Sequence, residues 1–368
     1  MEHSFTEKIR EILTQRFGAL AEDIYDKSCL LQYLNLKTRS ADRGSKSRSS
    51  FANLYAIYVL VEDYIANGYD KRSDYKDYEG AQFSLLFNRQ RELPFGGKLQ
   101  NHALNNRVNA EFQTNFPTID KFPIIRDPET NRYWINENLL VIKLGADKYN
   151  IASSIICIID EYVKVKQDSF SRFIRDCESL LALADREEDA VRDFIVGLLA
   201  PNVDARLFEI ISYAILKSHY KDQRIFWGYS QDDLTEEPLK LYKTGRTNAN
   251  DGGIDFVMRP LGRFFQVTET LDFKKYFLDI EKIERYPITF VIKSVEDVKL
   301  LEQKLRTDAS KTYVITEVVN KYISCIEEII NIPVLLKYFD ALVADGNISE
   351  VLSEVLLQSK VEFNLDEE

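Results

Sequence analysis

The chain has 368 residues, of which 45% are hydrophobic and 29% are charged, so it carries enough apolar side chain for one large domain or two ordinary ones. Aromatic residues are abundant (20 Tyr and 22 Phe) while glycine and proline are few (14 and 9), which excludes collagen-like, mucin-like and generally disordered chains. The net charge of −11 excludes a protein coated in basic charge, although a local basic face on an acidic body is compatible with a nucleic-acid partner.

Cysteine and histidine are too sparse to organise the fold around a metal or a disulfide framework. The four cysteines lie far apart without a CxxC pair, which favours a reducing compartment, and three histidines cannot build a metal cage. The N-terminus is charged and amphipathic, without the apolar stretch of a signal peptide, and the longest apolar runs are too short to span a bilayer. We therefore expect a cytoplasmic protein with no membrane segment.

Helices are expected at the start of the chain, because apolar residues from Phe5 to Leu34 recur at helical spacing. The polar segment 37–50 (KTRSADRGSKSRSS) predicts a loop, and Ser50 is placed to cap the aromatic and aliphatic helix that follows. An ordinary solvated loop is one interpretation of this segment. The other is a flexible arm that contacts DNA phosphates through its basic residues: Lys37, Arg39, Arg43, Lys46 and Arg48.

Charge is divided unevenly along the chain. Residues 1–110 hold 16 basic and 14 acidic side chains, a net +2, so the remainder of the chain carries −13. The N-terminal region is therefore the better candidate to meet an anionic polymer. Its segment 98–107 (KLQNHALNNR) contains side chains that read base edges, which are also ordinary surface residues. Residues 122–143 predict two strands joined by a D-P-E-T-N turn, and long helical patterns follow from about 147 to 199.

The pattern of predicted elements changes after residue 200. An amphipathic helix with an aspartate cap is followed by two strands around a Pro-Leu-Gly turn and then by alternating helices and strands, which predicts an α/β (α+β) fold with a mixed central sheet flanked by helices. We expect residues 1–200 to form a mainly helical region with a small β element and residues 201–368 to form the sheet-containing core. The predicted elements of this core are a helix at 204–220, strands at 253–258 and 263–268, a helix at 271–286, a strand at 288–292, a helix at 295–305, a strand at 312–316 and C-terminal helices.

Asp255 is the most informative residue, because it lies inside a β-favouring run where a carboxylate is unexpected. The short turn between the two strands requires antiparallel pairing, which brings Asp255 near Gln266 and Thr268 on one face of the next strand. A carboxylate and a second oxygen ligand on adjacent strands suit Mg²⁺, which completes its shell with waters and a substrate phosphate. The alternative is a turn residue or a satisfied polar group in the core.

This arrangement resembles the PD-(D/E)XK nuclease superfamily and, within it, a type II restriction endonuclease. Gly253-Ile254-Asp255 matches the first part of the family pattern, Gln266-Val267-Thr268 falls where the second part belongs, and Glu209 supplies the acidic residue of the preceding helix. The resemblance covers about residues 200–300. It implies a restriction-endonuclease-like core, Mg²⁺ held by Asp255 and Gln266, site-specific hydrolysis of double-stranded DNA, and a homodimer in which residues 1–200 recognise DNA.

Thr268 stands where the family has a lysine, so the resemblance implies that another lysine takes its place. We assign Lys274 to the catalytic set, together with Asp255, Gln266 and Glu209. The other lysines that could reach the site are Lys243, Lys275 and Lys293.

Other interpretations of the same residues stay open. Glu209 could form a salt bridge with Arg206 on a solvated helix face, and Thr268 is by default a good strand former. At the level of the whole protein, one alternative is a catalytically inactive DNA-binding or regulatory protein with a nuclease fold. The other is a helical interaction or scaffold protein.

Overall fold

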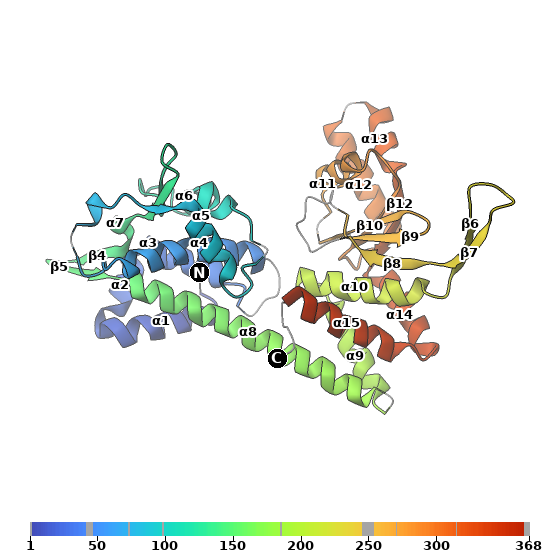
Figure 1. The fold of residues 1–368 in the computed structure, drawn as a ribbon, viewed down its shortest axis with the longest axis horizontal. Helices are drawn as coiled ribbons and strands as arrows, with labels where there is room; N and C mark the ends of the chain where they lie inside the picture. The colour runs from blue at the N-terminus through green and yellow to red at the C-terminus, as the bar shows by residue number, and fades with distance from the viewer. Residues whose placement is uncertain are drawn as a thin grey trace. The chain divides into compact units, whose positions relative to one another are not determined.

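The computed structural model describes residues 2–41, 47–72, 74–97, 99–184, 186–244, 254–269, 271–313 and 315–363 (Figure 1). The chain forms two compact units, Met1–Ser171 and Arg172–Glu368, and it mixes helices and strands as predicted. None of the described helices is long and apolar enough to cross a membrane.

The first unit is mainly helical, with a three-stranded antiparallel sheet in the order β1-β3-β2 and a separate β4–β5 hairpin. The D-P-E-T-N segment joins β2 to β3, which confirms the two predicted strands. The elements are α1 (Ser4–Phe17), η1 (Gly18–Leu20), α2 (Ala21–Lys27), α3 (Cys29–Thr38), α4 (Ser47–Ala66), η2 (Tyr75–Asp77), β1 (Ala81–Gln82), α5 (Phe83–Glu92), η3 (Ala103–Arg107), α6 (Val108–Asn115), β2 (Ile124–Asp127), β3 (Arg132–Ile135), α7 (Glu137–Leu140), β4 (Val141–Leu144), β5 (Asp147–Asn150) and α8 (Ala152–Leu183).

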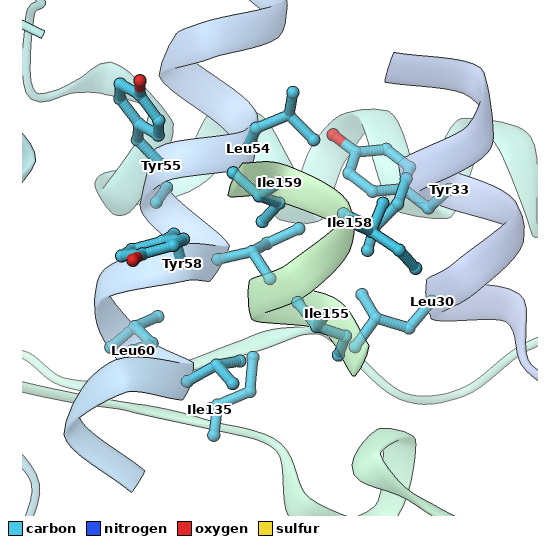
Figure 2. Close-up of a cluster of buried hydrophobic side chains, with 14 of the residues drawn as sticks. Leu30, Tyr33, Leu54, Tyr55, Tyr58, Leu60, Ile135, Ile155, Ile158 and Ile159 are labelled. Carbon is cyan, nitrogen blue, oxygen red and sulfur yellow. The ribbon is translucent and has the colours of Figure 1, made fainter. Parts of the chain in front are cut away.

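The core of the first unit is built where α3, α4 and α8 pack together (Figure 2). Side chains three or four positions apart on each helix share one face, so each helix turns a continuous apolar stripe toward the other two. Because α4 already begins at Ser47, Ser50 lies in its first turn and not at the N-cap that the sequence suggested. The labelled core residues are Leu30 and Tyr33 of α3, Leu54, Tyr55, Tyr58 and Leu60 of α4, Ile135 of β3, and Ile155, Ile158 and Ile159 of α8.

The second unit contains a five-stranded mixed sheet in the order β12-β11-β10-β9-β8. The pairs β8–β9 and β9–β10 are antiparallel, and β10, β11 and β12 run parallel. The elements are α9 (Glu188–Leu198), α10 (Ala205–Tyr220), β6 (Arg224–Trp227), β7 (Thr235–Pro238), β8 (Lys240–Lys243), β9 (Phe256–Arg259), β10 (Arg263–Thr268), α11 (Phe273–Lys282), β11 (Ile288–Ile292), α12 (Val298–Thr312), α13 (Thr316–Ile323), β12 (Ile326–Asn331), α14 (Ile332–Ala344) and α15 (Ile348–Phe363).

Two apolar clusters cover the two faces of this sheet. Phe265 and Val291 belong to the cluster that includes α10, α14 and α15, whereas Phe290 belongs to the cluster that includes α11 and α12. Alternation along the strands produces this division, because neighbouring residues of a strand point to opposite faces. The ring centroids of Tyr276 on α11 and Phe290 on β11 lie 4.2 Å apart, so α11 packs on the face of the sheet that carries Phe290.

Several predicted elements of the second unit are confirmed, and one predicted strand is wrong. Asp204 caps α10, and the strands at 263–268 and 288–292 are observed with those bounds. The strand predicted at 312–316 is wrong, because Thr312 ends α12, Thr316 begins α13, and Tyr313 stacks on Phe277 with ring centroids 5.7 Å apart. The strand that completes the sheet is β12 instead.

The compact units also divide earlier than the predicted boundary at residue 200. The boundary falls inside α8, after Ser171. The last part of α8 and all of α9 belong with the second unit because Cys177, Val191 and Ile195 are buried in the same apolar cluster as α10.

Candidate functional site

Asp255 lies immediately before β9, opposite the carboxyl end of β10. Its backbone N–H donates to the Phe265 carbonyl at 2.9 Å, and its carbonyl accepts from the Thr244 N–H at 3.1 Å. The β9–β10 register ends at Phe256 opposite Phe265, and the Asp255 N–H bonds to that same Phe265. The Val267 N–H donates to the Asp255 Oδ2, so the carboxylate lies against β10, next to the residue that follows Gln266. Gly262, at φ +69°, turns the chain between the two strands, a conformation that glycine adopts readily.

The Asp255 carboxylate is in a site that disfavours its negative charge. Burial raises its pKa to about 7, and the nearby negative charge of Glu209 adds to the rise. The Val267 N–H, which donates to Oδ2 at 2.7 Å, opposes the rise, as do the positive charges of Lys275 and Lys243. Asp255 makes no ion pair with any residue in the described part of the chain. The site therefore favours uptake of a positive charge, either a proton or a cation.

Gln266 contributes an unsatisfied acceptor at the same place. Its side chain is buried, and Nε2 donates to the Val267 carbonyl at 3.2 Å. Its Oε1 atom is buried without a hydrogen-bond partner. Buried polar atoms are nearly always partnered, so an orphaned amide oxygen beside a carboxylate needs a physical reason. A hard divalent cation is one, because amide and carboxylate oxygens are its ligands.

Glu209 reaches the site from α10 but is already engaged. Its Oε1 lies 3.0 Å from the Lys243 Nζ, and the two side chains are only 11% and 17% exposed. The alternative partner suggested by the sequence, Arg206, pairs with Asp204 at 3.4 Å. Glu209 is therefore neither a solvated surface residue nor a free ligand. It is one half of a buried ion pair whose negative charge reaches Asp255.

Lys275, and not Lys274, is the lysine of α11 that the structure brings to this cluster. The Lys275 Nζ donates to the Thr268 Oγ1 at 3.4 Å, and its charge lowers the pKa of Asp255. Asp272 caps α11 by accepting from the Lys274 N–H, and both Lys274 and Lys275 are exposed residues. One position along a helix rotates the side chain by about 100°. The contact with Thr268 makes Lys275 the better candidate, and the catalytic assignment of either lysine stays a prediction.

Lys293 is excluded as a mobile catalytic group. Its side chain is only 3% exposed, and its Nζ lies 2.8 Å from the Glu269 Oε1 and also donates to the Val203 carbonyl. These bonds tie the ends of β10 and β11 to the segment that leads into α10. We call Asp255, Gln266, Glu209, Lys243 and Lys275 the Asp255 cluster.

The Asp255 cluster is compatible with a cation, but it is not a dense metal cage. No group of three or more His, Cys, Asp or Glu side chains that could hold a metal ion occurs among the described residues. Here the oxygen ligands would be the Asp255 carboxylate and the Gln266 Oε1, with water and substrate completing the shell. That set fits Mg²⁺, which commonly uses one or two carboxylates and keeps several waters.

The predicted DNA-binding residues of the first unit have different outcomes. Lys37 is partly buried: its Nζ donates to the Glu111 Oε2, and its side chain is 16% exposed. Arg39, at the end of α3, is exposed. Arg43 and Lys46 lie outside the described residues, and Arg48 lies on α4 with a side chain that is not described. The prediction for Lys37 is corrected for a physical reason: it is half of a partly buried ion pair.

Glu111 is the centre of a second charged group, which we call the Glu111 cluster. Arg107 Nε donates to its Oε1 at 3.0 Å, and Asn53 Nδ2 donates to its Oε2 at 2.7 Å. Burial by itself would raise the pKa of Glu111, but Lys37 and Arg107 outweigh burial and lower it. Arg107 ends η3, a short π-helical stretch within the segment 98–107, so the cluster fixes this segment against α3 and α4.

No protein-family model, curated protein or solved structure matches the chain. Sequence reasoning missed two features of the site, the engagement of Glu209 by Lys243 and the choice of Lys275. The N-cap signal of Asp272 could have indicated the second, because it sets the start of α11.

Proposed function

We propose that the chain is a type II restriction endonuclease. It would use Mg²⁺ to hydrolyse phosphodiester bonds of double-stranded DNA at specific sites. One observation carries the proposal. A half-buried aspartate with a raised pKa accepts a hydrogen bond from the Val267 N–H of β10, and the residue before Val267, Gln266, has a buried amide oxygen with no hydrogen-bond partner among the described residues. Perturbed carboxylates of this kind concentrate at functional sites.

The order of elements supports the assignment to the PD-(D/E)XK superfamily. The helix that carries Glu209 precedes the strand pair that carries Asp255 and Gln266, and a helix and a parallel strand follow. This is the order that the resemblance implies for a restriction-endonuclease-like core. The Asp255 cluster also lies at the carboxyl end of β10, and in open α/β sheets ligands bind at the carboxyl ends of the strands.

Each residue of the Asp255 cluster has a separate task in this mechanism. Asp255 and Gln266 would hold Mg²⁺, which supplies Lewis acidity toward the scissile phosphate and its leaving oxygen. Lys275 donates a hydrogen bond to the attacking water from the position next to Thr268, where the family has its lysine. Lys243 holds Glu209 in place, so the negative charge of Glu209 stays beside Asp255 and favours cation uptake.

The proposal also includes the DNA partner, the assembly and the location. Arg39 on the first unit is available for a phosphate contact. A homodimer related by a two-fold axis would supply two sites for the two strands of a palindrome. A cytoplasmic location suits a DNA substrate and the four cysteines, all of which are free thiols.

The direct test is plasmid cleavage by purified protein in Mg²⁺, repeated in EDTA, with wild type, Asp255→Ala and the control Asp308→Ala. Asp308 is an aspartate of the same unit with an exposed side chain that pairs with Lys311. We expect cleavage by wild type and the control, and a loss of about 10³-fold or more in the Asp255 variant, since metal Lewis acidity contributes several kcal/mol. Near wild-type cleavage by Asp255→Ala would refute the catalytic assignment.

A second candidate function is a DNA-binding protein that keeps the nuclease fold without activity. Two observations favour it: threonine stands in the lysine position, and Glu209 is committed to an ion pair with Lys243. A gel shift in Ca²⁺ separates the candidates. DNA binding without cleavage in Mg²⁺ supports the inactive protein, and absence of both supports an interaction or scaffold protein.

A further inference from the structure

The β6–β7 hairpin exposes several large apolar side chains on a projecting arm. Phe226 is 69% exposed and Tyr229 is 93% exposed, and Trp227 and Leu234 are exposed as well. Figure 1 shows the hairpin extending clear of the five-stranded sheet. Grouped exposed aromatic residues mark an interaction surface, because aromatic side chains dominate the energetic centres of interfaces. We call residues 224–238 the arm.

The turn of the arm holds two aromatic rings in one place. A Cβ atom at Gly228 would lie 1.9 Å from the Asp233 carbonyl oxygen, so the two backbone segments can approach only because residue 228 is glycine. The Asp233 N–H also donates to the Ser230 carbonyl at 3.2 Å. The Trp227 and Tyr229 rings, on either side of Gly228 in the chain, pack edge to face with their centroids 6.2 Å apart. The tip of the arm therefore presents an ordered aromatic surface.

The arm carries a strong negative charge. Its sequence, RIFWGYSQDDLTEEP, holds four acidic residues and one basic residue, and all five are exposed. The basic residue, Arg224, pairs with Glu236 at 2.7 Å. The acidic residues of the arm that form no ion pair with any residue in the described ranges are Asp232, Asp233 and Glu237. The arm therefore has three carboxylates to offer a cationic partner.

Each face of the hairpin carries an aromatic side chain next to a carboxylate. Phe226 lies directly opposite Glu236, so both side chains are on one face. Trp227 lies opposite Thr235, and Glu237, two positions beyond Thr235, shares the other face with Trp227. An aromatic ring attracts a cation to its π face, and a nearby carboxylate neutralises the same cation. The arrangement therefore suits a partner with several positive charges.

The charge of the arm excludes anionic partners and disfavours a second copy of the arm. Its carboxylates would repel nucleic acid and anionic lipid, and a second arm would bring the same negative charge. Among cationic side chains arginine fits best, because its planar guanidinium stacks on aromatic rings and bonds a carboxylate through two parallel hydrogen bonds. We propose that the arm binds an arginine-rich segment of another protein. The proposal goes beyond the nuclease assignment and uses no property of the Asp255 cluster.

Fluorescence anisotropy of a labelled nona-arginine peptide, titrated with the full chain, tests this binding. We expect wild type to bind the peptide and the double variant Phe226→Ser/Tyr229→Ser to bind it at least about tenfold more weakly. The control Leu85→Ser/Leu357→Ser removes two exposed apolar residues elsewhere, at 63% and 53% exposure, and should bind like wild type. Both variants keep every charge of the chain, so a loss confined to the arm variant does not come from the general attraction between an acidic protein and a basic peptide.

A second pair of variants tests the carboxylates. Asp232→Asn/Asp233→Asn should weaken binding about fivefold, as expected for exposed ion pairs, and binding by wild type should weaken as salt rises. The matched control Glu188→Gln/Asp189→Asn removes two adjacent exposed acidic residues at the start of α9 and should bind within about twofold of wild type. Equal losses in the two variants would show that the peptide responds only to net charge, which would overturn the proposal.

The single variant Tyr229→Ser keeps the test decisive if thermal melting shows that the double aromatic variant fails to fold. Tyr229 lies in the turn and is almost fully exposed, so its removal leaves the apolar core of the second unit intact and should weaken binding about fivefold. A nona-lysine peptide should bind wild type more weakly than nona-arginine, because an ammonium group does not stack on a ring. The proposal is overturned if wild type does not bind nona-arginine, if nona-lysine binds as tightly, or if the aromatic variants bind like wild type. Sedimentation of wild type as a dimer that the aromatic substitutions dissociate would assign the arm to a second copy instead.

Discussion

The Glu111 cluster of the first unit and the Asp255 cluster of the second both hold partly buried carboxylates. The negative charge of Glu111 is compensated by bonded cations, whereas that of Asp255 is not. Glu111 is bonded by Lys37, Arg107 and Asn53, and its pKa is lowered despite burial. Among the described residues, the Asp255 carboxylate accepts a hydrogen bond only from the Val267 N–H, and its pKa is raised to about 7.

The difference separates a structural site from a functional one. In the Glu111 cluster two cations and an amide N–H compensate the carboxylate within the first unit, so the group stabilises the fold. In the Asp255 cluster the lysine in close contact with a carboxylate is committed to Glu209, so the charge of Asp255 has no ion-pair partner among the described residues. Unsatisfied charge of this kind costs stability and is retained where a ligand supplies the missing interaction.

The largest expected effect distinguishes the lysines of the two clusters. Lys275→Ala should reduce plasmid cleavage about 100-fold, the loss typical of a group that assists proton transfer. Lys274→Ala and Lys37→Ala should cut within about twofold of wild type, because Lys275 is the α11 lysine that bonds to Thr268 and Lys37 is bonded to Glu111. Cleavage rates in Mg²⁺ decide this. A greater loss in Lys274→Ala than in Lys275→Ala would reverse our assignment.

The second effect concerns stability. Glu111→Gln should destabilise the protein by about 2 kcal/mol, since it leaves Lys37 and Arg107 side by side without their counter-charge. Urea denaturation measures the change. The control Glu11→Gln removes an exposed carboxylate of the same unit that pairs with Lys8, and should change stability by less than about 0.5 kcal/mol. Equal effects of the two substitutions would show that the Glu111 cluster is no more than a surface ion pair.

The third effect has the opposite sign. The pKa of Asp255 is about 7 in the folded protein and about 3.9 in the unfolded chain. Ionised Asp255 therefore lowers the free energy of unfolding: the loss is absent at pH 4, grows up to pH 7 and is complete above pH 7. Asp255→Asn should therefore stabilise the protein in EDTA by about 1–2 kcal/mol at pH 8, and the gain should shrink toward pH 4. Denaturation at pH 8 and pH 5 provides the comparison. A variant less stable than wild type at pH 8 contradicts the raised pKa.

The smallest effect concerns DNA affinity. Arg39→Ala should lower the slope of log affinity against log salt by about one, the signature of one lost phosphate contact. Lys37→Ala should leave the slope unchanged, because Glu111 already neutralises that charge. Binding titrations in Ca²⁺ at several salt concentrations measure both slopes. Equal slopes for Arg39→Ala and wild type would remove Arg39 from the interface.

The parts of the site that depend on local geometry were predictable from the sequence. A three-residue turn permits only antiparallel pairing, so the pairing of β9 with β10, which brings Asp255 to β10, follows from the spacing. The Asp204 cap predicted the start of α10 for a similar reason. Local rules of this kind depend on a few neighbouring residues and need no knowledge of the packed core.

The parts that depend on packing between distant segments were not predictable. Glu209 has Arg206 at i−3, the usual helical partner, yet pairs with Lys243 because α10 packs against β8. Lys37 belongs to a basic segment by composition, and only the approach of α6 shows that Glu111 neutralises it. The β6–β7 hairpin was not predicted from the sequence, because its four acidic residues conceal the strands, the first of which carries Phe226 and Trp227.

The most direct test of the central claim is thermal melting of the full chain with Mg²⁺ alone, at pH 6 and pH 8.5, for wild type and Asp255→Asn. The account holds that Asp255 binds a proton or a cation but not both. Mg²⁺ should therefore stabilise wild type more at pH 8.5 than at pH 6. Below a pKa of about 7 protons compete with Mg²⁺ for Asp255, and each pH unit of competition lowers the stabilisation by Mg²⁺ by about 1.4 kcal/mol. Asp255→Asn should gain nothing from Mg²⁺ at either pH. Equal stabilisation of both proteins by Mg²⁺ would contradict the claim that the Asp255 cluster is the cation site.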